Sequence, residues 1–356
     1  MVRKVGTARI VREIGRGGMG VVYEAEQEAL DRPVAVKALD PKLARHEEVL
    51  ERFRREGRAY ARLRHEAIIA VHDLVEKDDG IFLVTEYVDG ADLAKILAEG
   101  GPLPADCVAV VGARVAEALD YVHFEKLLHR DVKPANVMVS RLGEVKLMDF
   151  GIAKAATDHG LTSDGMLVGS PSYMAPEVLE GDPGSPAADV WSLGVSLYEL
   201  LTGEKPFSGK TAQELFTSIR KGRHRRVRKL APDCPLRLAR VVERCLAKRP
   251  ENRWASAGAL AEALEGVSRR LLPRRMHARA RLVAMLTHRG FVTEAVALTR
   301  IEISTLNSTA FEDAAHGPRT SVEFPRPRSL VHPGLRHAVA LLLAAAAGVT
   351  AWLVGS

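Results

Sequence analysis

The stretch from His129 to Asn136 constrains this chain of 356 residues more than any other. It places a carboxylate, an ammonium group and an amide close together, as Asp131, Lys133 and Asn136. Such an aspartate can accept the proton of an attacking hydroxyl, and the lysine can neutralise charge on a phosphoryl group. The amide carbonyl can hold a metal ion. The pattern therefore favours a loop built for phosphoryl transfer over a merely polar loop between two strands.

A glycine-rich stretch, Gly15-Arg16-Gly17-Gly18-Met19-Gly20-Val21-Val22, follows an alternating strand that ends at Ile14. Glycines let backbone amides approach phosphates without obstruction by side chains. The pattern alone is weak, because dinucleotide-binding folds also have it. In those folds a helix follows the glycines, whereas here residues 21–25 continue as a strand. We therefore expect a hairpin that covers phosphates.

Further motifs follow in a fixed order along the chain. They are Val34-Ala35-Val36-Lys37, Asp149-Phe150-Gly151, Ala175-Pro176-Glu177 and Asp189-Val190-Trp191-Ser192-Leu193-Gly194. Together with residues 129–136, this set resembles the protein kinase family, and Lys133-Pro134 resembles its Ser/Thr branch, as in the bacterial, eukaryotic-like members. The resemblance covers residues 8–265. It implies a bilobal α+β fold, with a β-rich N-lobe over about 8–87 and an α-rich C-lobe over about 88–265.

The resemblance also implies the site residues. Asp131 and Lys133 would be catalytic, and Asn136 with Asp149 would hold Mg²⁺. Backbone groups at Glu86 and Val88 would meet the adenine of ATP, next to a small residue, Thr85. The implied ATP-binding residues are Ile14, Gly15, Arg16, Gly17, Gly18, Met19, Gly20, Val21, Val22, Lys37, Glu56, Glu86, Val88 and Asp92.

Two of these residues have competing interpretations. Glu56 shares a helical stripe with Phe53 and Tyr60, which favours an inward carboxylate that pairs with Lys37. The alternative is a surface charge that pairs with Arg52. Asp92 matches the ribose-binding acid of the family, but an acid that begins a helix is equally well explained by the helix dipole.

An activation loop is expected over residues 152–173, which are rich in hydroxyl groups. Thr162 and Ser163 are the candidate phosphorylation sites, because Thr162 matches a phosphorylated threonine of bacterial receptor-type kinases. Arg130, beside the catalytic Asp131, could bind such a phosphate. For any one hydroxyl, ordinary solvent-exposed loop chemistry is the competing interpretation.

Charge is unevenly distributed along the sequence. Residues 266–336 hold 12 Arg, no Lys and 5 acidic residues, a balance of +7. Because the whole chain is +6 and its last 20 residues are uncharged, the first 265 residues sum to −1. The three cysteines, Cys107, Cys234 and Cys245, have no metal-binding spacing and suit a reducing compartment. The N-terminus has no apolar run, so no signal peptide is expected.

The uncharged segment over 337–356 is predicted to be a transmembrane helix, preceded by a basic juxtamembrane or linker segment over 266–336. The arginines before it place the kinase domain in the cytoplasm. Ala340, Ala344 and Gly348 would lie on one helix face and allow a homodimer. The alternative is an alanine-rich helix packed on a soluble domain.

The predicted function is transfer of the γ-phosphate of ATP, with Mg²⁺, to Ser or Thr of a protein substrate. A membrane-tethered pseudokinase that serves as a nucleotide-binding scaffold is the alternative, although Lys37, Asp131, Asn136 and Asp149 are all present. The arginine-rich tail lacks interleaved aromatic residues, so no nucleic-acid partner is expected.

Overall fold

The computed structural model describes residues 4–17, 20–41, 47–77, 80–150, 171–272 and 277–293. Within helix α1, the side chains at positions 48, 49, 52 and 56 lie outside this description. The chain divides into two compact units, Met1–Thr305 and Leu306–Ser356, and all described residues belong to the first unit.

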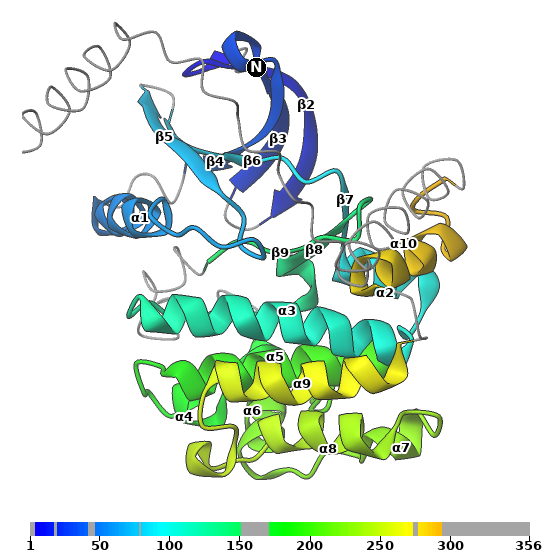
Figure 1. Ribbon diagram of the computed structural model, residues 1–356. Coiled ribbons are helices and arrows are strands. Elements are labelled where there is room, and N and C mark those ends of the chain that lie inside the picture. Colours follow the sequence, from blue (N-terminus) through cyan, green and yellow to red (C-terminus); the bar gives the residue numbers. More distant parts are fainter. Residues whose placement is uncertain are drawn as a thin grey trace, which may run out of the picture. The chain divides into compact units, whose positions relative to one another are not determined.

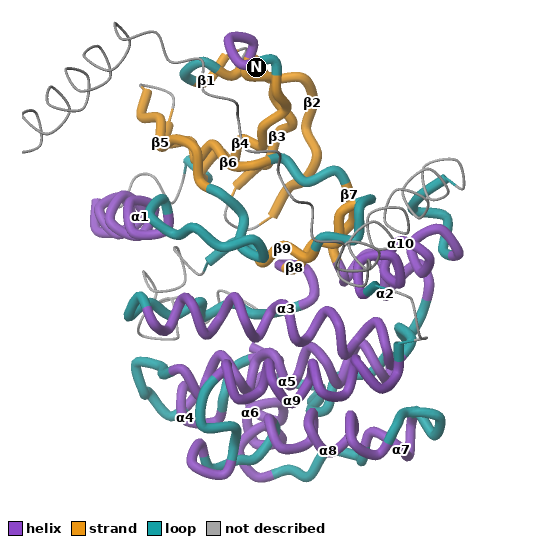
Figure 2. Tube along the Cα trace, viewed as in Figure 1, coloured by secondary structure: helices purple, strands orange, loops and turns teal. Residues whose placement is uncertain are grey.

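The amino-terminal lobe is a six-stranded antiparallel sheet with the order β1-β2-β3-β4-β6-β5 (Figures 1 and 2). The strands are β1 (Lys4–Val5), β2 (Ala8–Gly17), β3 (Gly20–Gln27), β4 (Arg32–Leu39), β5 (Val71–Lys77) and β6 (Gly80–Glu86). Helix α1 (Glu47–Tyr60) lies between β4 and β5 in the sequence and packs beside the sheet.

The alternation of side chains along two central strands divides the sheet into a core face and a pocket face. Val34 and Val36 of β4 are fully buried in a small core that also contains Phe82 and Val84 of β6. Because successive side chains of a strand point to opposite faces, Lys37 points away from this core. The VAVK pattern thus delivers a lysine to the inter-lobe pocket, which Lys37 lines.

The carboxy-terminal lobe is helical. Its helices are α2 (Leu93–Gly100), α3 (Ala105–Phe124), α4 (Pro176–Leu179), α5 (Pro186–Thr202), α6 (Ala212–Lys221), α7 (Val227–Leu230), α8 (Leu236–Cys245), α9 (Ala257–Leu271) and α10 (Ala278–His288). Helices α3 and α5 are apolar on nearly all sides, and both are largely buried. A helix with apolar residues all around belongs in the centre of a lobe, and α3 packs against both α5 and α9.

A small antiparallel sheet supports residues 129–136, called the catalytic loop below. It consists of β7 (Gly90–Asp92), β8 (Val137–Ser140) and β9 (Val145–Leu147), in the order β7-β8-β9. A short 3₁₀ turn, Pro134–Asn136, leads directly into β8. Residues 129–136 are thereby fixed between α3 and this sheet.

Helix α10 packs onto the lobe through its apolar side chains and three arginines. Leu282 and Leu286 are buried, and Arg281 binds Asp106 of α3 through two hydrogen bonds of 2.5 and 3.1 Å. Arg289 donates to the carbonyl oxygens of Ile96, Gly101 and Pro102, where α2 ends. The third, Arg279, approaches Gly143 so closely that a Cβ there would lie 2.3 Å from the Arg279 carbonyl oxygen.

The bilobal α+β architecture expected from the sequence is confirmed. None of the helices in the described part of the chain combines the length and apolar character needed to cross a membrane. The expected transmembrane helix over 337–356 lies outside the described residues, as do residues 273–276 and 294–336 of the expected juxtamembrane or linker segment over 266–336. The described residues of that segment contain the end of α9 and all of α10.

Candidate active site

A pocket of about 430 Å³ lies between the two lobes. Ala35 and Lys37 of β4 line it from the sheet, and Met138 of β8 lines it from the helical lobe. It passes Thr85 and reaches Phe53 of α1, so the small side chain at position 85 leaves the rear of the pocket open, as the sequence indicated. The volume is that of a typical small-molecule or cofactor site.

One ion pair crosses the pocket between the lobes. The Lys37 Nζ lies 2.7 Å from Oδ1 of Asp149, although the two residues are 112 positions apart. Both residues line the pocket, and Asp149 has a left-handed backbone with φ of 50°. A cation and a carboxylate therefore stand side by side where phosphates and a metal ion would be needed.

The catalytic-loop side chains converge on one carboxylate. Oδ2 of Asp131 accepts hydrogen bonds from Nζ of Lys133 at 2.9 Å and from Nδ2 of Asn136 at 3.0 Å. The Asn136 amide also donates to the Asp131 carbonyl oxygen at 2.7 Å. The 3₁₀ turn that begins at Pro134 brings Asn136 back to Asp131. Asp131 is buried, so its carboxylate is fixed by these donors.

Asp189 of α5 holds the backbone of the same loop from below. Its two carboxylate oxygens accept the backbone N–H groups of His129 and Arg130, each at 2.9 Å. Arg130 has a φ of 63°, a left-handed conformation that costs free energy for a residue with a side chain. The hydrogen bonds that Asp189 accepts stabilise this conformation, and Asp189 is itself nearly inaccessible. His123 of α3 also contacts Asp189, at 2.9 Å.

Stacked rings join α1 to the catalytic loop. Phe150 stacks on Tyr60 of α1 with ring centroids 4.2 Å apart, and its other neighbour is His129 at 4.6 Å. Phe53 and Tyr60 are both buried, as the helical stripe read from the sequence indicated. A displacement of α1 would therefore disturb Phe150 and, with it, the adjacent Asp149.

Burial sets the charge states beneath the loop. Burial lowers the pKa of His129, and the nearby Asp189 and Asp131 offset this only partly. Neutral His129 suits its contacts, because Nδ1 accepts the Asp131 backbone N–H and Nε2 lies 3.0 Å from the Met148 carbonyl oxygen. Burial would raise the pKa of Asp189, but the hydrogen bonds from the His123 ring and from the His129 backbone outweigh it, so that pKa is lowered.

The expected adenine-binding segment lines the pocket at Glu86 and Val88. The Glu86 carboxylate is occupied elsewhere, by Lys146 at 2.9 Å and by the backbone of Ala70. The Glu86 N–H donates to the Ala70 carbonyl oxygen. Val88, by contrast, makes no backbone–backbone hydrogen bond with any other described residue. Its N–H and C=O are the groups left for a planar base.

Gly15 and Val22 of the glycine-rich stretch line the pocket, together with Ile14, which precedes the stretch. Arg16 instead forms an exposed pair with Glu13 at 2.7 Å. Gly17, Gly20 and Val21 complete the β2–β3 hairpin. Position 20 requires glycine, because its φ is 139° and a Cβ there would lie 1.8 Å from the Ala38 carbonyl oxygen. The sequence did not reveal this close approach.

The position of Asp92 is compatible with both interpretations offered by the sequence, and its contact with a ribose stays a prediction. It is the N-cap of α2, and its Oδ1 accepts the Lys95 backbone N–H at 2.8 Å. It also lines the pocket. A capping residue at the rim has a fixed position, so it can serve a ligand as well as the helix.

Several predicted site residues lie outside the described atoms. They are Gly18, Met19, Thr162 and Ser163, together with the side chain of Glu56. The expected pairing of Glu56 with Lys37 therefore stays a prediction, as do the two phosphorylation sites.

The donor set fits Mg²⁺ held jointly by protein and nucleotide. Among the described residues there is no cluster of three His, Cys, Asp or Glu that could hold a metal by itself. Asp149 offers one carboxylate, and Asn136 offers Oδ1 because Nδ2 is the donor. One or two protein oxygen ligands supplemented by phosphates suit Mg²⁺. The metal would supply positive charge to the phosphates.

A buried ion pair fixes the segment that follows the expected activation loop. Arg253 is inaccessible and binds both carboxylate oxygens of Glu177, at 2.6 and 2.7 Å. It also donates to the carbonyl oxygens of Ala187, Ala247 and Lys248. The ion pair thus joins the Ala175-Pro176-Glu177 motif to a residue 76 positions later in the chain.

Comparison with known proteins agrees with this geometry. The family model described as protein kinase domain matches residues 8–264, most of the chain. The chain belongs to the protein kinase family. The relationship identified from the sequence motifs is thereby confirmed.

Relatives of this protein kinase include mycobacterial proteins. Serine/threonine-protein kinase PknH of Mycobacterium tuberculosis is 40% identical over 257 residues, which are 72% of this chain and 41% of PknH. PknL of the same species is 38% identical over 259 residues, 73% of this chain and 65% of PknL. The crystal structure of the M. tuberculosis PknI kinase domain superimposes with a TM-score of 0.60 at 32% identity, covering 74% of this chain and 96% of that domain. This kinase thus spans only part of the curated relatives' length.

Several residues of the kinase site were not predicted from the sequence. His123 contacts Asp189, and Lys146 holds Glu86. Ala35 lines the pocket, and its position between Val34 and Val36 could have predicted this. No local pattern marks His123, because its partner lies 66 residues away.

Proposed function

We propose that this protein transfers the γ-phosphate of ATP to Ser or Thr side chains of protein substrates. The observation that carries the proposal is the loop centred on Asp131, where an ordered, buried carboxylate is held by Lys133 and Asn136. A nucleotide-binding scaffold needs no such carboxylate. The names of the related Ser/Thr protein kinases support the same activity.

Each residue has a role that follows from its contacts. Asp131 orients the substrate hydroxyl and accepts its proton. Lys133, bound to the same carboxylate, lies where it can offset negative charge on the phosphoryl group. Lys37 binds phosphate oxygens from the opposite side of the pocket, and Asn136 with Asp149 would hold Mg²⁺.

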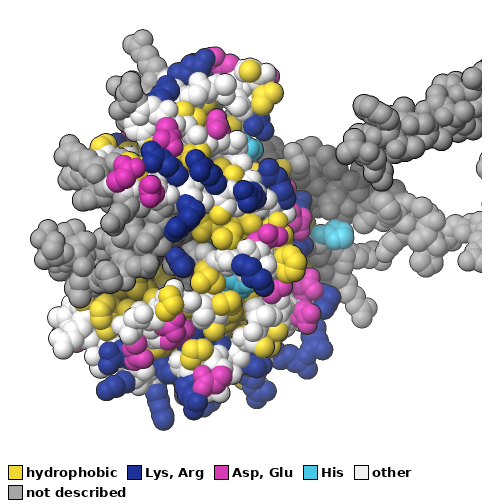
Figure 3. Space-filling model, turned by 90° about the vertical axis from the view of Figure 1, so that its left-hand side faces the viewer, with side chains coloured by type: hydrophobic (Ala, Val, Ile, Leu, Met, Phe, Trp, Pro, Cys, Tyr) yellow, Lys and Arg dark blue, Asp and Glu magenta, His cyan; other side chains and the backbone are white. Residues whose placement is uncertain are grey.

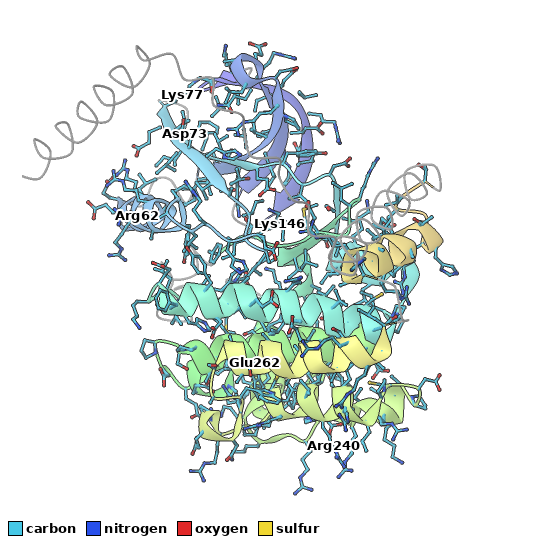
Figure 4. All side chains as sticks on the ribbon, in the orientation of Figure 1. Arg62, Asp73, Lys77, Lys146, Arg240 and Glu262 are labelled. Atoms are coloured by element: carbon cyan, nitrogen blue, oxygen red, sulfur yellow. The ribbon has the colours of Figure 1, made fainter. Side chains whose placement is uncertain are left out.

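The test compares transfer with nucleotide binding in single variants. Asp131→Asn keeps the shape of the loop and removes the base, so phosphate transfer should fall by about 100-fold or more while ATP binding persists. Lys37→Met should weaken both. Lys77→Met, which removes a lysine at the far end of β5 (Figure 4), is the matched control. Undiminished transfer by Asp131→Asn would contradict the assignment, and ATP binding without transfer by the unaltered protein would favour a scaffold.

We also propose that phosphorylation at Thr162 or Ser163 activates the enzyme. Arg130 supports this proposal. It is an exposed arginine beside Asp131, and its guanidinium pairs with no carboxylate of the described residues. A phosphate there would find a cation next to the catalytic loop. Thr162→Ala combined with Ser163→Ala should slow activation after ATP is added, and an unchanged lag would contradict the switch.

The proposed location is a membrane, with the kinase domain in the cytoplasm and residues 337–356 as the anchor. Support comes from the sequence, since 338–356 are uncharged and arginines precede them. The full chain should resist extraction from membranes by alkali, whereas a chain that ends at Arg336 should not. Dimerisation through Ala340, Ala344 and Gly348 is the finer proposal. Replacing Ala344 and Gly348 by leucine should slow autophosphorylation without releasing the protein.

A further inference from the structure

The base of the helical lobe carries a concentration of positive charge that the catalytic site does not use. Residues 220–249 contain 12 Lys or Arg and only 2 acidic residues, a balance of +10. The first 265 residues sum to −1, so the remainder of that stretch carries −11. The kinase domain thus carries an excess of positive charge over residues 220–249, which include α7 and α8, and an excess of negative charge over its other residues.

Most of these cations lack acidic partners, which distinguishes them from the arginines of the sheet. Arg9, Arg12 and Arg16 all form ion pairs with glutamates. Within the described part of the chain, no carboxylate pairs with eight exposed cations of the base: Lys221, Arg223, Arg226, Arg228, Lys229, Arg237, Arg240 and Arg244. Dark-blue side chains accordingly line the lower edge of the molecule in Figure 3.

A groove lies within this surface, between α8 and α9. Its volume is about 370 Å³. Arg237 and Arg240 of α8 line one side, and Arg270 of α9 lines the other. Val241 and Val267 form an apolar floor and are themselves buried. We call this the basal groove; Figure 4 shows Arg240 at its position on α8.

The groove has room for an apolar side chain. Gly266 lines it, and a Cβ added there would meet no atom within 4 Å. Leu236, which begins α8 beside Arg237, is 47% exposed. The combination of open apolar floor and cationic rim is suited to a ligand that carries both aliphatic and negatively charged groups.

We propose that the basal groove is a docking site for an acidic segment of a protein partner, one that inserts an aliphatic side chain between α8 and α9. Charge complementarity requires aspartates or glutamates to meet Arg237, Arg240 and Arg270. Arginine guanidinium groups bind carboxylates in a two-pronged geometry. The concave apolar floor then selects segments that also contain leucine or a similar residue.

Two other polyanions fit the surface less well. Single-stranded nucleic acid binding uses exposed aromatic rings for base stacking, but none of the described residues that line the groove is aromatic. Trp254, which donates to the Val241 carbonyl oxygen, is covered by the Arg244 guanidinium at 4.3 Å. An anionic membrane needs cations on a surface that lies flat against lipid, and it would leave the groove floor unfilled. A protein segment uses both the rim and the floor.

The test measures binding of a fluorescent acidic peptide that contains leucine to the full chain, without ATP. Because no ATP is present, the result is independent of phosphoryl transfer. Arg237→Glu with Arg240→Glu should weaken binding at least about tenfold. Arg58→Glu with Arg62→Glu makes the same change of charge in α1 and just after its end, where Figure 4 labels Arg62, and should leave binding within about twofold.

A second variant tests the floor without disturbing the charges. Gly266→Leu fills the groove, and it should fold because nothing opposes a Cβ there and leucine favours helix more than glycine does. It should weaken binding of the leucine-containing peptide about tenfold and leave an acidic peptide without leucine unaffected. Glu262→Gln, which removes the one acidic side chain on the rim, should strengthen binding of both peptides.

Three results would overturn the proposal. The first is peptide binding that is insensitive to Arg237→Glu with Arg240→Glu. The second is binding insensitive to Gly266→Leu, which would leave only a diffuse positive surface. The third is no peptide binding together with binding, dependent on Arg237 and Arg240, to phosphatidylserine-containing vesicles or to RNA. That outcome would assign the surface to a membrane or to nucleic acid.

Discussion

At the scale of single residues, Asp189 is the main support of the catalytic loop. Replacing it by alanine leaves the N–H groups of His129 and Arg130 buried without their acceptor. Each such loss costs about 1–3 kcal/mol, so we expect the free energy of unfolding to fall by about 3 kcal/mol. Urea denaturation measures this. Asp120→Ala is the control, because Asp120 is exposed and accepts one hydrogen bond, from Gly258. Equal costs for the two variants would contradict the account.

The burial of His129 should make the free energy of unfolding depend on pH under acidic conditions. Burial lowers its folded pKa below 6.5, the ordinary value. As the pH falls below that value, the unfolded chain binds a proton that folded His129 does not, so the free energy of unfolding decreases. The slope from this one group approaches about 1.4 kcal/mol per pH unit at most.

His129→Phe tests this directly. Phenylalanine keeps a ring against Phe150 but cannot titrate. The variant should be less stable at neutral pH, because it loses the hydrogen bond with Asp131. Its stability should decline less steeply between pH 6.5 and more acidic values, as followed by urea denaturation across a pH series. Parallel curves for the two proteins would show that His129 is not the titrating group.

At the scale of elements, α10 extends the kinase fold beyond residue 264, where the family match ends. Arg289 donates to three carbonyl oxygens where α2 ends, and a cation is favourable at a helix C-terminus. Arg289→Ala should therefore lower the free energy of unfolding by about 2 kcal/mol. Arg279→Ala, whose pairs with Glu144 and Glu66 are exposed, should cost about 0.5 kcal/mol or less.

Arg289→Ala should also affect the pocket. Helix α2 is capped by the pocket residue Asp92 at its start, and it ends beside the carbonyl oxygens to which Arg289 donates. We expect the KM for ATP to rise with little change in kcat. Arg289→Lys should keep part of the stability and part of the affinity for ATP that Arg289→Ala loses. If neither stability nor KM changes, α10 contributes nothing to the lobe.

Elements with a local signal were predictable from the sequence, and those without one were not. The motif Val34-Ala35-Val36-Lys37, through its resemblance to the protein kinase family, predicted that Lys37 lies in the pocket, and the stripe through Phe53 and Tyr60 predicted the buried face of α1. The docking of α10 was not predicted, because Arg281 finds Asp106 175 positions away. Arg289 binds backbone carbonyl oxygens, and because every residue has one, the sequence does not indicate which of them an arginine will bind.

At the scale of the whole molecule, both lobes build one nucleotide pocket, so nucleotide should stabilise the fold. A ligand that binds only the folded state at 100 times its Kd adds about 2.7 kcal/mol. ATP with Mg²⁺ should thus raise the melting temperature of the full chain. Removing Mg²⁺ with a chelator, or replacing Asp149 by asparagine, should reduce this shift. A shift that is unaffected by both changes would place the nucleotide elsewhere.

The central claim is that this kinase phosphorylates Ser or Thr. The most direct measurement incubates the full chain with Mg²⁺ and ATP labelled in its γ-phosphate, then identifies the labelled residues by mass spectrometry. Phosphoserine or phosphothreonine should appear in the unaltered protein and be nearly absent from Asp131→Asn under the same conditions. Absence of label from a protein that binds ATP, or equal label in the two proteins, would contradict the account.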